Sequence, residues 1–416
     1  MAPPRAKRRR VGASSKTTSG LDERIYPKDP LVPISDEVKD RWNGFCEIES
    51  EPALFSVMLR EFGVSGIKVQ EVISLDEEII ASLHKPVYGL IFLFRWREEE
   101  ADKQEASCPD GLWFANQTTH NACASVALLN IVNNIDSLDL GEKLQRFKDF
   151  TMDFTPALRG DAINNFEFVK RIHNSFARKM DMLNSDLQLK NESTFKRSRG
   201  SKKGNASADF EAGFHFIAFV PAMGKVWKLD GLERQPQALG LCSEEDWMDL
   251  VKPMILSRML EYEEDQIEFS ILGVVRDPLV DYIAQLAQNV KALQRIDTKL
   301  AERGSEPGSH DSQPNVILGP DASLRLTEAD IDNATIPAAE AEEYELASAE
   351  NLLLHRQTLV SLQQSIRQSI NGELQSHQEE DDYASGRRHD YGPAVRAWIK
   401  KLAHRQIIQE LVKKSH

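Results

Sequence analysis

A continuous apolar run at residues 85–96, KPVYGLIFLFRW, constrains the fold of this 416-residue chain more than any other feature. Runs of this length without polar alternation are typical of a strand buried on both faces of a sheet. It is preceded by an amphipathic helix-like stretch that ends at Gly63, a strand-like stretch at residues 67–72 and a helix-like stretch at 75–83. This order predicts an α/β-type domain with the apolar run at the centre of its sheet.

A second apolar stretch follows a polar loop at residues 97–110 and has the three- and four-residue spacing of a buried helix. We expect this helix to begin near Ala122, with Asn121 as its N-cap. Cys123 then lies in the first turn, where free N–H groups and the helix dipole favour negative charge on sulfur. Cys123 is therefore the candidate nucleophile, and the alternative is a small buried hydrophobe.

Gln117 precedes Cys123 by six residues. Its side-chain amide could fold back beside the Cys123 N–H and donate a hydrogen bond to a developing oxyanion. The alternative is an ordinary loop residue.

Two strand-like runs, FHFIAFV and KVWKL, are joined by the four residues PAMG, which predicts a hairpin with a four-residue loop. If Val220 pairs with Lys225, His215 lies opposite Asp230. Directly opposed residues have Cβ atoms about 4.5 to 5.5 Å apart, within reach of a hydrogen bond between the side chains.

Taken singly, Asp230 before a glycine is a turn residue and His215 between two phenylalanines is a core histidine. Together with Cys123 and Gln117, they supply the nucleophile, base, orienting carboxylate and oxyanion donor of a thiol hydrolase.

Composition narrows the class of protein. The four cysteines form no CxxC pair, which argues against a disulfide framework or a cysteine zinc site and favours a reducing compartment. The net charge of −14 argues against a general nucleic-acid binder, and no run of about 18 apolar residues predicts a membrane span.

Two polar segments carry basic clusters. The segment PRAKRRRV at residues 4–11 lies in a tail that we expect to be disordered, and it is typical of a nuclear localisation signal or of a solvated tail. Residues 181–213 lose the apolar pattern and contain KRSRGSKKG, which predicts a long loop that is either functional or disordered.

The C-terminal third has a helical pattern. Residues 278–300 predict an amphipathic helix, residues 304–324 a flexible linker, and residues 328–376 further helix, followed by an acidic break at 379–382. The last segment, HDYGPAVRAWIKKLAHRQIIQELVKK, has more apolar residues than so small a unit can bury. We expect it to dock on an adaptor, or to pair with the preceding helix.

Several motifs in the same order resemble the ubiquitin carboxyl-terminal hydrolase family of cysteine proteases: WNGFCEIESEPALF, FANQ with HNACAS, and FHFIAFVP with GKVWKLDGL. The resemblance covers about residues 38–276. It implies Cys123 as nucleophile, His215 as general base and acid, Asp230 as the group that orients His215, and Gln117 as oxyanion donor. The chain has a histidine and an asparagine before Ala122 where the family usually has two asparagines.

The resemblance further implies a papain-like fold with a central, mostly antiparallel sheet and a knotted backbone. It makes residues 181–213 the crossover loop over the active site. The last segment resembles the C-terminal helical domain of the larger, proteasome-associated members. The domains expected are a basic tail (1–37), the catalytic domain (38–276), an amphipathic helix (277–303), a linker (304–327) and a helical adaptor-docking domain (328–416).

The expected function is thiol-dependent hydrolysis of the bond after the C-terminal glycine of ubiquitin, at the proteasome, in nucleus and cytoplasm. Expected partners are ubiquitin, its conjugates and an adaptor, without membrane, nucleic acid, cofactor or metal. The alternatives are a chromatin-associated deubiquitinase acting on ubiquitinated histone and a ubiquitin-binding scaffold with little turnover.

Overall fold

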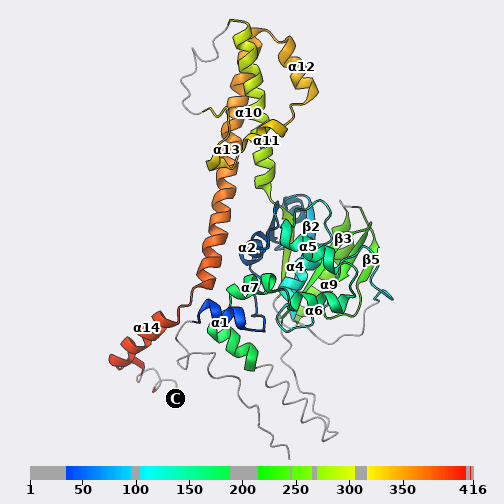
Figure 1. Ribbon diagram of the computed structural model, residues 1–416, viewed down its shortest axis with the longest axis vertical. Helices are drawn as coiled ribbons and strands as arrows, with labels where there is room; N and C mark the ends of the chain where they lie inside the picture. Colours follow the sequence, from blue (N-terminus) through cyan, green and yellow to red (C-terminus); the bar gives the residue numbers. More distant parts are fainter. Residues whose placement is uncertain are drawn as a thin grey trace, which may run out of the picture.

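The chain folds into a wide α/β body from which a pair of long helices projects, as the computed structural model in Figure 1 shows. The structure describes residues 34–95, 104–187, 214–243, 246–264, 269–304, 316–408 and 413. The basic segment predicted at residues 4–11 and the KRSRGSKKG stretch lie outside the described residues.

A six-stranded sheet forms the centre of the body. Its strands are β1 (Ile67–Glu71), β2 (Val87–Arg95), β3 (Phe214–Ala222), β4 (Lys225–Leu229), β5 (Gln237–Leu241) and β6 (Ser270–Arg276). They lie in the order β1-β6-β2-β3-β4-β5, and every ladder between them is antiparallel. The interior position of β2 confirms the central strand predicted from the apolar run, and the ladders confirm the antiparallel sheet that the resemblance implies.

Helices cover both faces of this sheet (Figure 1). Side chains along β2 alternate between the two cores, since Ile91 packs in one and Leu90 and Phe92 pack in the other. The body contains the helices α1 (Asp36–Arg41), α2 (Pro52–Phe62), α3 (Glu77–Ser82), α4 (Cys123–Val132), α5 (Gly141–Thr151), α6 (Pro156–Asn164), α7 (Glu167–Ser175) and α9 (Trp247–Glu264). Residues 179–187 are helical as well, so the first residues of the loop predicted at 181–213 are part of a helix.

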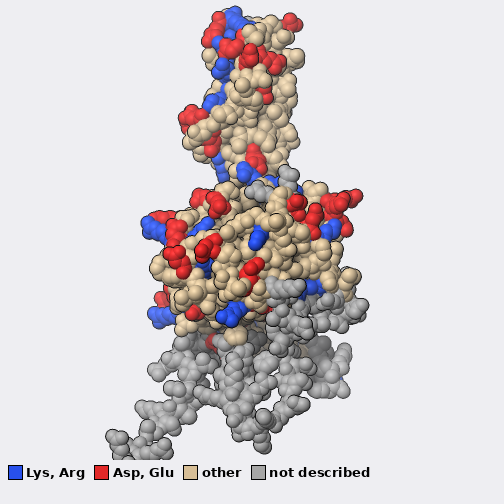
Figure 2. Space-filling model, turned by 90° about the vertical axis from the view of Figure 1, so that its right-hand side faces the viewer, with Lys and Arg blue, Asp and Glu red and all other residues tan. Residues whose placement is uncertain are grey.

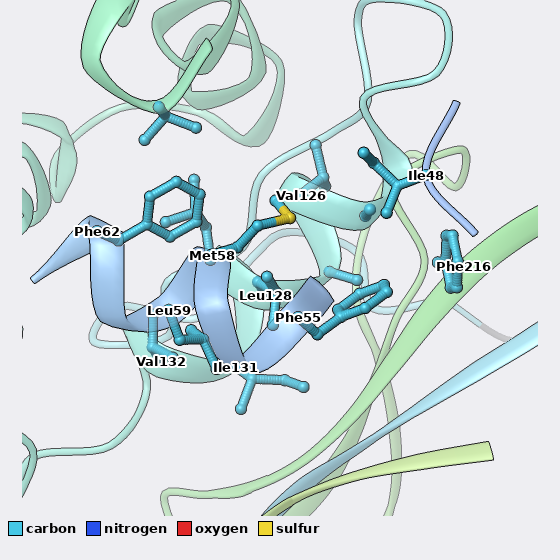
Figure 3. Packing of buried hydrophobic residues seen from close by; sticks show 14 of the residues in the cluster. Ile48, Phe55, Met58, Leu59, Phe62, Val126, Leu128, Ile131, Val132 and Phe216 are labelled. Atoms are coloured by element: carbon cyan, nitrogen blue, oxygen red, sulfur yellow. The ribbon is translucent and has the colours of Figure 1, made fainter. Parts of the chain in front are cut away.

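The core that holds α4 in place is formed with α2 (Figure 3). The first core contains Phe55, Met58, Leu59 and Phe62 of α2 with Val126, Leu128, Ile131 and Val132 of α4. Burial of each such side chain contributes about 1.5–3 kcal/mol, so α4 is a rigid support for the residue at its N-terminus. The second core packs Trp247, Val251 and Ile255 of α9 on the opposite face.

The β3–β4 hairpin differs from its predicted register. The loop is two residues long, Met223 and Gly224, with φ of 54° and 71°, and Val220 pairs with Trp227 instead of Lys225. Two successive positive φ values are typical of the tight I′ turn, whose twist matches that of the flanking strands. The predicted pairing of His215 with Asp230 was therefore wrong by two residues.

Two long helices form the projection. α10 (Pro278–Glu302) packs against α13 (Ala349–Arg388), and α11 (Glu328–Asn333), α12 (Ala338–Leu346) and the short 3₁₀ turn η1 (Ala322–Leu324) lie beside them (Figure 1). Leu324 and Leu326 are buried between α10 and α13, so this part of the predicted linker is packed. Figure 2 shows the projection as narrower than the body.

The predicted acidic break at residues 379–382 is wrong, because α13 continues through it to Arg388. Arg60 of α2 forms ion pairs with Glu380 and Asp381, which neutralises the acidic cluster that would disfavour a helix. α14 (Gly392–His404) follows and lies apart from the body (Figure 1). Among the described residues, no helix has the length and apolar character that crossing a membrane demands.

Candidate active site

Cys123 lies in the first turn of α4, as the sequence predicted, and is the first residue of that helix; its side chain is partly exposed. The N-cap is Ala122 and not Asn121, which has a left-handed φ of 60°. The Asn121 side chain donates instead to the carbonyl of Phe45 at 3.2 Å and to the hydroxyl of Ser185 at 3.0 Å. Asn121 thus anchors the turn before Cys123 without capping the helix.

His215 and Asp230 meet despite the shifted register. The ladder ends at the pair Ala218–Leu229, and its register extended by one residue places Asp230 opposite Ile217. His215 then reaches Asp230 along the diagonal of the same face. Nε2 of His215 lies 2.7 Å from Oδ1 of Asp230, and both side chains are buried. The same Oδ1 accepts the backbone N–H of Leu232 at 2.9 Å, so Asp230 is a turn residue and a partner of His215 at once.

The electrostatics of this pair favour a charged imidazole. Burial lowers the pKa of His215, but hydrogen bonds to Asp230 and Cys123 outweigh it and raise the pKa to about 9. Burial likewise opposes the charge on Asp230, yet the hydrogen bond from His215 leaves the pKa of Asp230 lowered. Cys123, His215 and Asp230 therefore form one hydrogen-bonded chain with an imidazolium at its centre at neutral pH.

Gln117 lies beside the turn that follows Asp230. Its backbone N–H donates to the carbonyl of Gly231 at 2.8 Å. Its side-chain nitrogen donates to the carbonyl of Thr119 at 3.2 Å, and its side-chain oxygen is buried without a hydrogen-bond partner. The residue is thus held close to the His215–Asp230 pair with one amide hydrogen still available.

Asn116 is a residue that the sequence reasoning missed. Its side-chain nitrogen donates to the carbonyl of Glu233 at 2.6 Å and to that of Gly231 at 3.5 Å. It therefore links the segment that carries Gln117 to the turn that carries Asp230. Its position next to Gln117 in FANQ was the available signal.

A second pair of cysteine and histidine, Cys46 and His173, lies in the core with opposite properties. Burial raises the pKa of Cys46 to about 12 and lowers that of His173 to about 4. Nε2 of His173 donates to the Cys46 carbonyl at 2.8 Å, and its Nδ1 accepts from Ser125 of α4 at 2.8 Å. Neutral groups with satisfied hydrogen bonds make this pair structural.

One group of residues with metal-ligand chemistry lies elsewhere, where α10 begins and meets α13. Ligand atoms of Asp277, Glu373 and His377 lie within 4.8 Å of one another. Lys68 forms an ion pair with Glu373 at 3.0 Å, so a cationic side chain already neutralises the cluster. This group contributes nothing to the chain of residues at Cys123.

Comparison with known proteins identifies the family. The sequence model described as "Ubiquitin carboxyl-terminal hydrolase, family 1" matches residues 45–260, which include Cys123, His215 and Asp230. The chain belongs to this family. It is a cysteine-type ubiquitin carboxyl-terminal hydrolase, which confirms the family and the deubiquitinase activity expected from the sequence.

Relatives extend the similarity beyond the catalytic domain. The ubiquitin carboxyl-terminal hydrolase isozyme L5 of Dictyostelium discoideum is 30% identical over 376 residues, or 89% of this chain and 95% of that protein. The hydrolase ubh-4 of Caenorhabditis elegans is 37% identical over 56% of this chain and 66% of its own length. A crystal structure of Trichinella spiralis UCH37 bound to ubiquitin vinyl methyl ester is 30% identical, covers 73% of this chain and 99% of that chain, and has a TM-score of 0.46.

The Dictyostelium match is longer than residues 38–276 can accommodate. The α10–α13 projection is therefore shared, at least in part, with a relative from the same family.

Proposed function

We propose that this ubiquitin carboxyl-terminal hydrolase uses Cys123 as its nucleophile, His215 as general base and acid, and Asp230 to orient His215. The observation that supports the proposal is the 2.7 Å hydrogen bond between His215 and Asp230, together with the contact of His215 with the partly exposed Cys123. Since Nε2 of His215 is bonded to Asp230, Nδ1 is the nitrogen that faces the sulfur.

The reaction follows from these positions. The Cys123 thiolate attacks the carbonyl carbon of the last ubiquitin glycine and forms a tetrahedral intermediate. The amide of Gln117 and the free N–H groups at the start of α4 donate to its oxyanion. The His215 imidazolium gives its proton to the leaving amine, and the thioester that remains is hydrolysed by a water whose proton His215 accepts.

Cys46 cannot take the role of Cys123, although it also contacts a histidine. Its thiol is fully buried, and its raised pKa keeps it protonated at neutral pH. A protonated, inaccessible thiol is inert as a nucleophile.

The test is Cys123→Ala, measured by hydrolysis of a fluorogenic amide at the ubiquitin C-terminus and by covalent labelling with a ubiquitin electrophile. We expect both to be lost, because Cys46, which also lies beside a histidine, is buried and protonated at neutral pH. Cys108→Ala and Cys242→Ala are the matched controls and should retain both. Hydrolysis by the Cys123→Ala protein would reject the assignment, and absence of turnover in the wild type would favour a ubiquitin-binding scaffold.

We further propose that α14 docks on an adaptor at the proteasome and thereby directs the enzyme to ubiquitin conjugates in nucleus and cytoplasm. Its described residues include none that is buried, and Trp398 is 63% exposed, with Val395 and Ile399 beside it. An exposed apolar face on a helix of this length is typical of a protein-binding surface. Capture of chromatin components in place of proteasome subunits would favour the chromatin-associated alternative.

A further inference from the structure

The turn before Cys123 is held by the helical residues 179–187, which overlap the start of the expected crossover loop. Asn121, two residues before Cys123, donates to Ser185 of this helix at 3.0 Å. Asn121 has a positive φ, which costs a non-glycine residue conformational energy and requires surrounding contacts to maintain it. Ser185 is one of those contacts, so a shift of the 179–187 helix moves the residue that sets the position of Cys123.

The 179–187 helix is in turn fixed by the C-terminal region. Nη2 of Arg387 lies 3.2 Å from Oδ2 of Asp181, which is one helical turn before Ser185. The same Oδ2 accepts the backbone N–H of Arg178 at 2.9 Å, so Asp181 organises the start of the helix. Arg387 therefore contacts one of the residues that fix the orientation of this helix, another being Asp186, which accepts from Nε1 of Trp42 at 3.0 Å.

Arg387 lies in the last turn of α13, and it is buried. Its Nη1 donates to the carbonyl of Phe176 at 2.8 Å, and its Nε donates to Glu49 at 2.8 Å. A guanidinium that donates to fixed acceptors on three sides has little freedom to move, which makes it a rigid support. Arg388, the next residue, bonds Ser175 and Glu61 and has no bond to the 179–187 helix among these contacts.

We propose that Arg387 is a positioning residue for hydrolysis, acting through Asp181, Ser185 and Asn121 on the turn that presents Cys123. The proposal rests on the proposed role of Cys123 as nucleophile. The helix α13 is then a structural part of the catalytic apparatus. Any change that displaces its last turn from the body lowers the rate of hydrolysis. Coupling of this kind needs a continuous physical path, and each step here is a hydrogen bond or one turn of helix.

The first experiment compares Arg387→Ala with Arg388→Ala in the full chain. Arg387→Ala should lower kcat for a small ubiquitin adduct about tenfold with KM changed less than twofold, since misplacement of a reacting atom acts on the chemical step. It should also slow alkylation of Cys123 by iodoacetamide at pH 7, which reports contact with His215. Arg388→Ala should retain wild-type kcat. Equal losses in the two variants would overturn the proposal in favour of general loosening of α13.

The second experiment is a double-mutant cycle between Arg387 and Ser185. If the two residues act through one path, Ser185→Ala should lower kcat like Arg387→Ala, and the double variant should lose little more. If the fold-reductions in kcat of the two single variants multiplied in the double variant, the two residues would act independently and the path would be rejected. Arg387→Lys keeps the positive charge and serves as the control in case Arg387→Ala does not fold. It should give a kcat between those of the wild type and Arg387→Ala. Failure of the proposed function itself would be seen separately, as activity of Cys123→Ala.

Discussion

At the scale of single residues, two cysteines lie beside a histidine in the part of the chain that the structure describes, and the surroundings decide which of the two reacts. His215 has a carboxylate partner in Asp230, which together with Cys123 overcomes the effect of burial on its pKa. His173 has only a carbonyl and a hydroxyl as partners, so burial prevails and its pKa falls to about 4. Residue identity alone does not distinguish the pairs, whereas the charge of the neighbouring group does.

The pH dependence of hydrolysis tests the state of His215. Its pKa is raised to about 9, so the imidazolium is present below that pH and is lost as the pH rises through it. We expect kcat/KM to fall on the alkaline side near pH 9. Asp230→Asn should slow turnover about 10²–10⁴-fold and move this alkaline limb to lower pH, because the charge that holds the proton is gone.

Asp249→Asn, at an exposed position on α9, is the control and should leave the profile unchanged. An alkaline limb at the same pH in Asp230→Asn would show that Asp230 does not set the pKa of His215.

The stability of the protein at acidic pH tests whether the buried His173 is neutral. Because its folded pKa of about 4 lies below its ordinary value, stability from this group is present above about pH 6.5 and is lost as the pH falls toward 4. Between pH 7 and pH 4.5, His173 should lower the free energy of unfolding by on the order of 2–3 kcal/mol. Urea unfolding of wild type and His173→Asn at both pH values measures it. An equal pH dependence in the two proteins would contradict a neutral His173.

At the scale of elements, the sequence predicted the parts whose pattern is strong. The apolar run gave β2 and the spacing around Cys123 gave α4, since both are dictated by burial. The hairpin register was wrong because Pro221 and Ala222, which look like turn residues, belong to β3. The contact of His215 with Asp230 survives because diagonal neighbours on one face are also within reach.

Elements without a clear pattern were not predicted. β5 lies at the sheet edge and is only partly buried, so it has no alternation to recognise. α9 has a proline, Pro253, within its helix. The link through Asn116 could not be predicted either, because it joins segments more than a hundred residues apart.

The close approach of α6 to the Gln117 segment yields a matched pair of substitutions. A Cβ at Gly160 would lie 2.1 Å from the backbone oxygen of Asn116, whereas a Cβ at Gly372 in α13 meets nothing within 4 Å. Gly160→Ala should therefore destabilise the protein by more than about 2 kcal/mol and lower kcat by displacing Gln117. Gly372→Ala should stabilise by up to about 1 kcal/mol. Thermal unfolding measures the stability of each variant, and hydrolysis of a ubiquitin adduct measures its kcat. Wild-type stability and kcat in Gly160→Ala would contradict the close packing of α6 against Asn116.

At the scale of the whole molecule, the C-terminal region combines two kinds of surface. α13 lies along α2 (Figure 1), and its charged side chains pair with residues more than 300 positions earlier, such as Arg60 with Glu380 and Lys68 with Glu373. Such ion pairs cannot be predicted from the sequence, because no local sequence pattern indicates which distant residues will meet. α14, by contrast, has no buried residue among those that the structure describes, and its side chains Val395, Trp398 and Ile399 are exposed.

This contrast predicts that α14 can be altered without effect on catalysis. Val395, Trp398 and Ile399 lie on one side of the helix at helical spacing, and Ala397 lies on the other side. Trp398→Asp should leave hydrolysis of a small ubiquitin adduct within twofold of wild type, because α14 contributes no buried residue to the body. It should abolish co-purification with the adaptor, since one charge in the centre of an apolar interface costs several kcal/mol.

Ala397→Asp introduces the same charge on the opposite side and should keep the adaptor. The measurements are hydrolysis of the small adduct by each purified variant and mass spectrometry of the proteins captured with it. If Trp398→Asp and Ala397→Asp captured the same partners, the apolar side of α14 would not be the docking surface. If Trp398→Asp lost hydrolysis of the small adduct, α14 would instead belong to the catalytic body, and the separation of α13 as support from α14 as docking helix would fail.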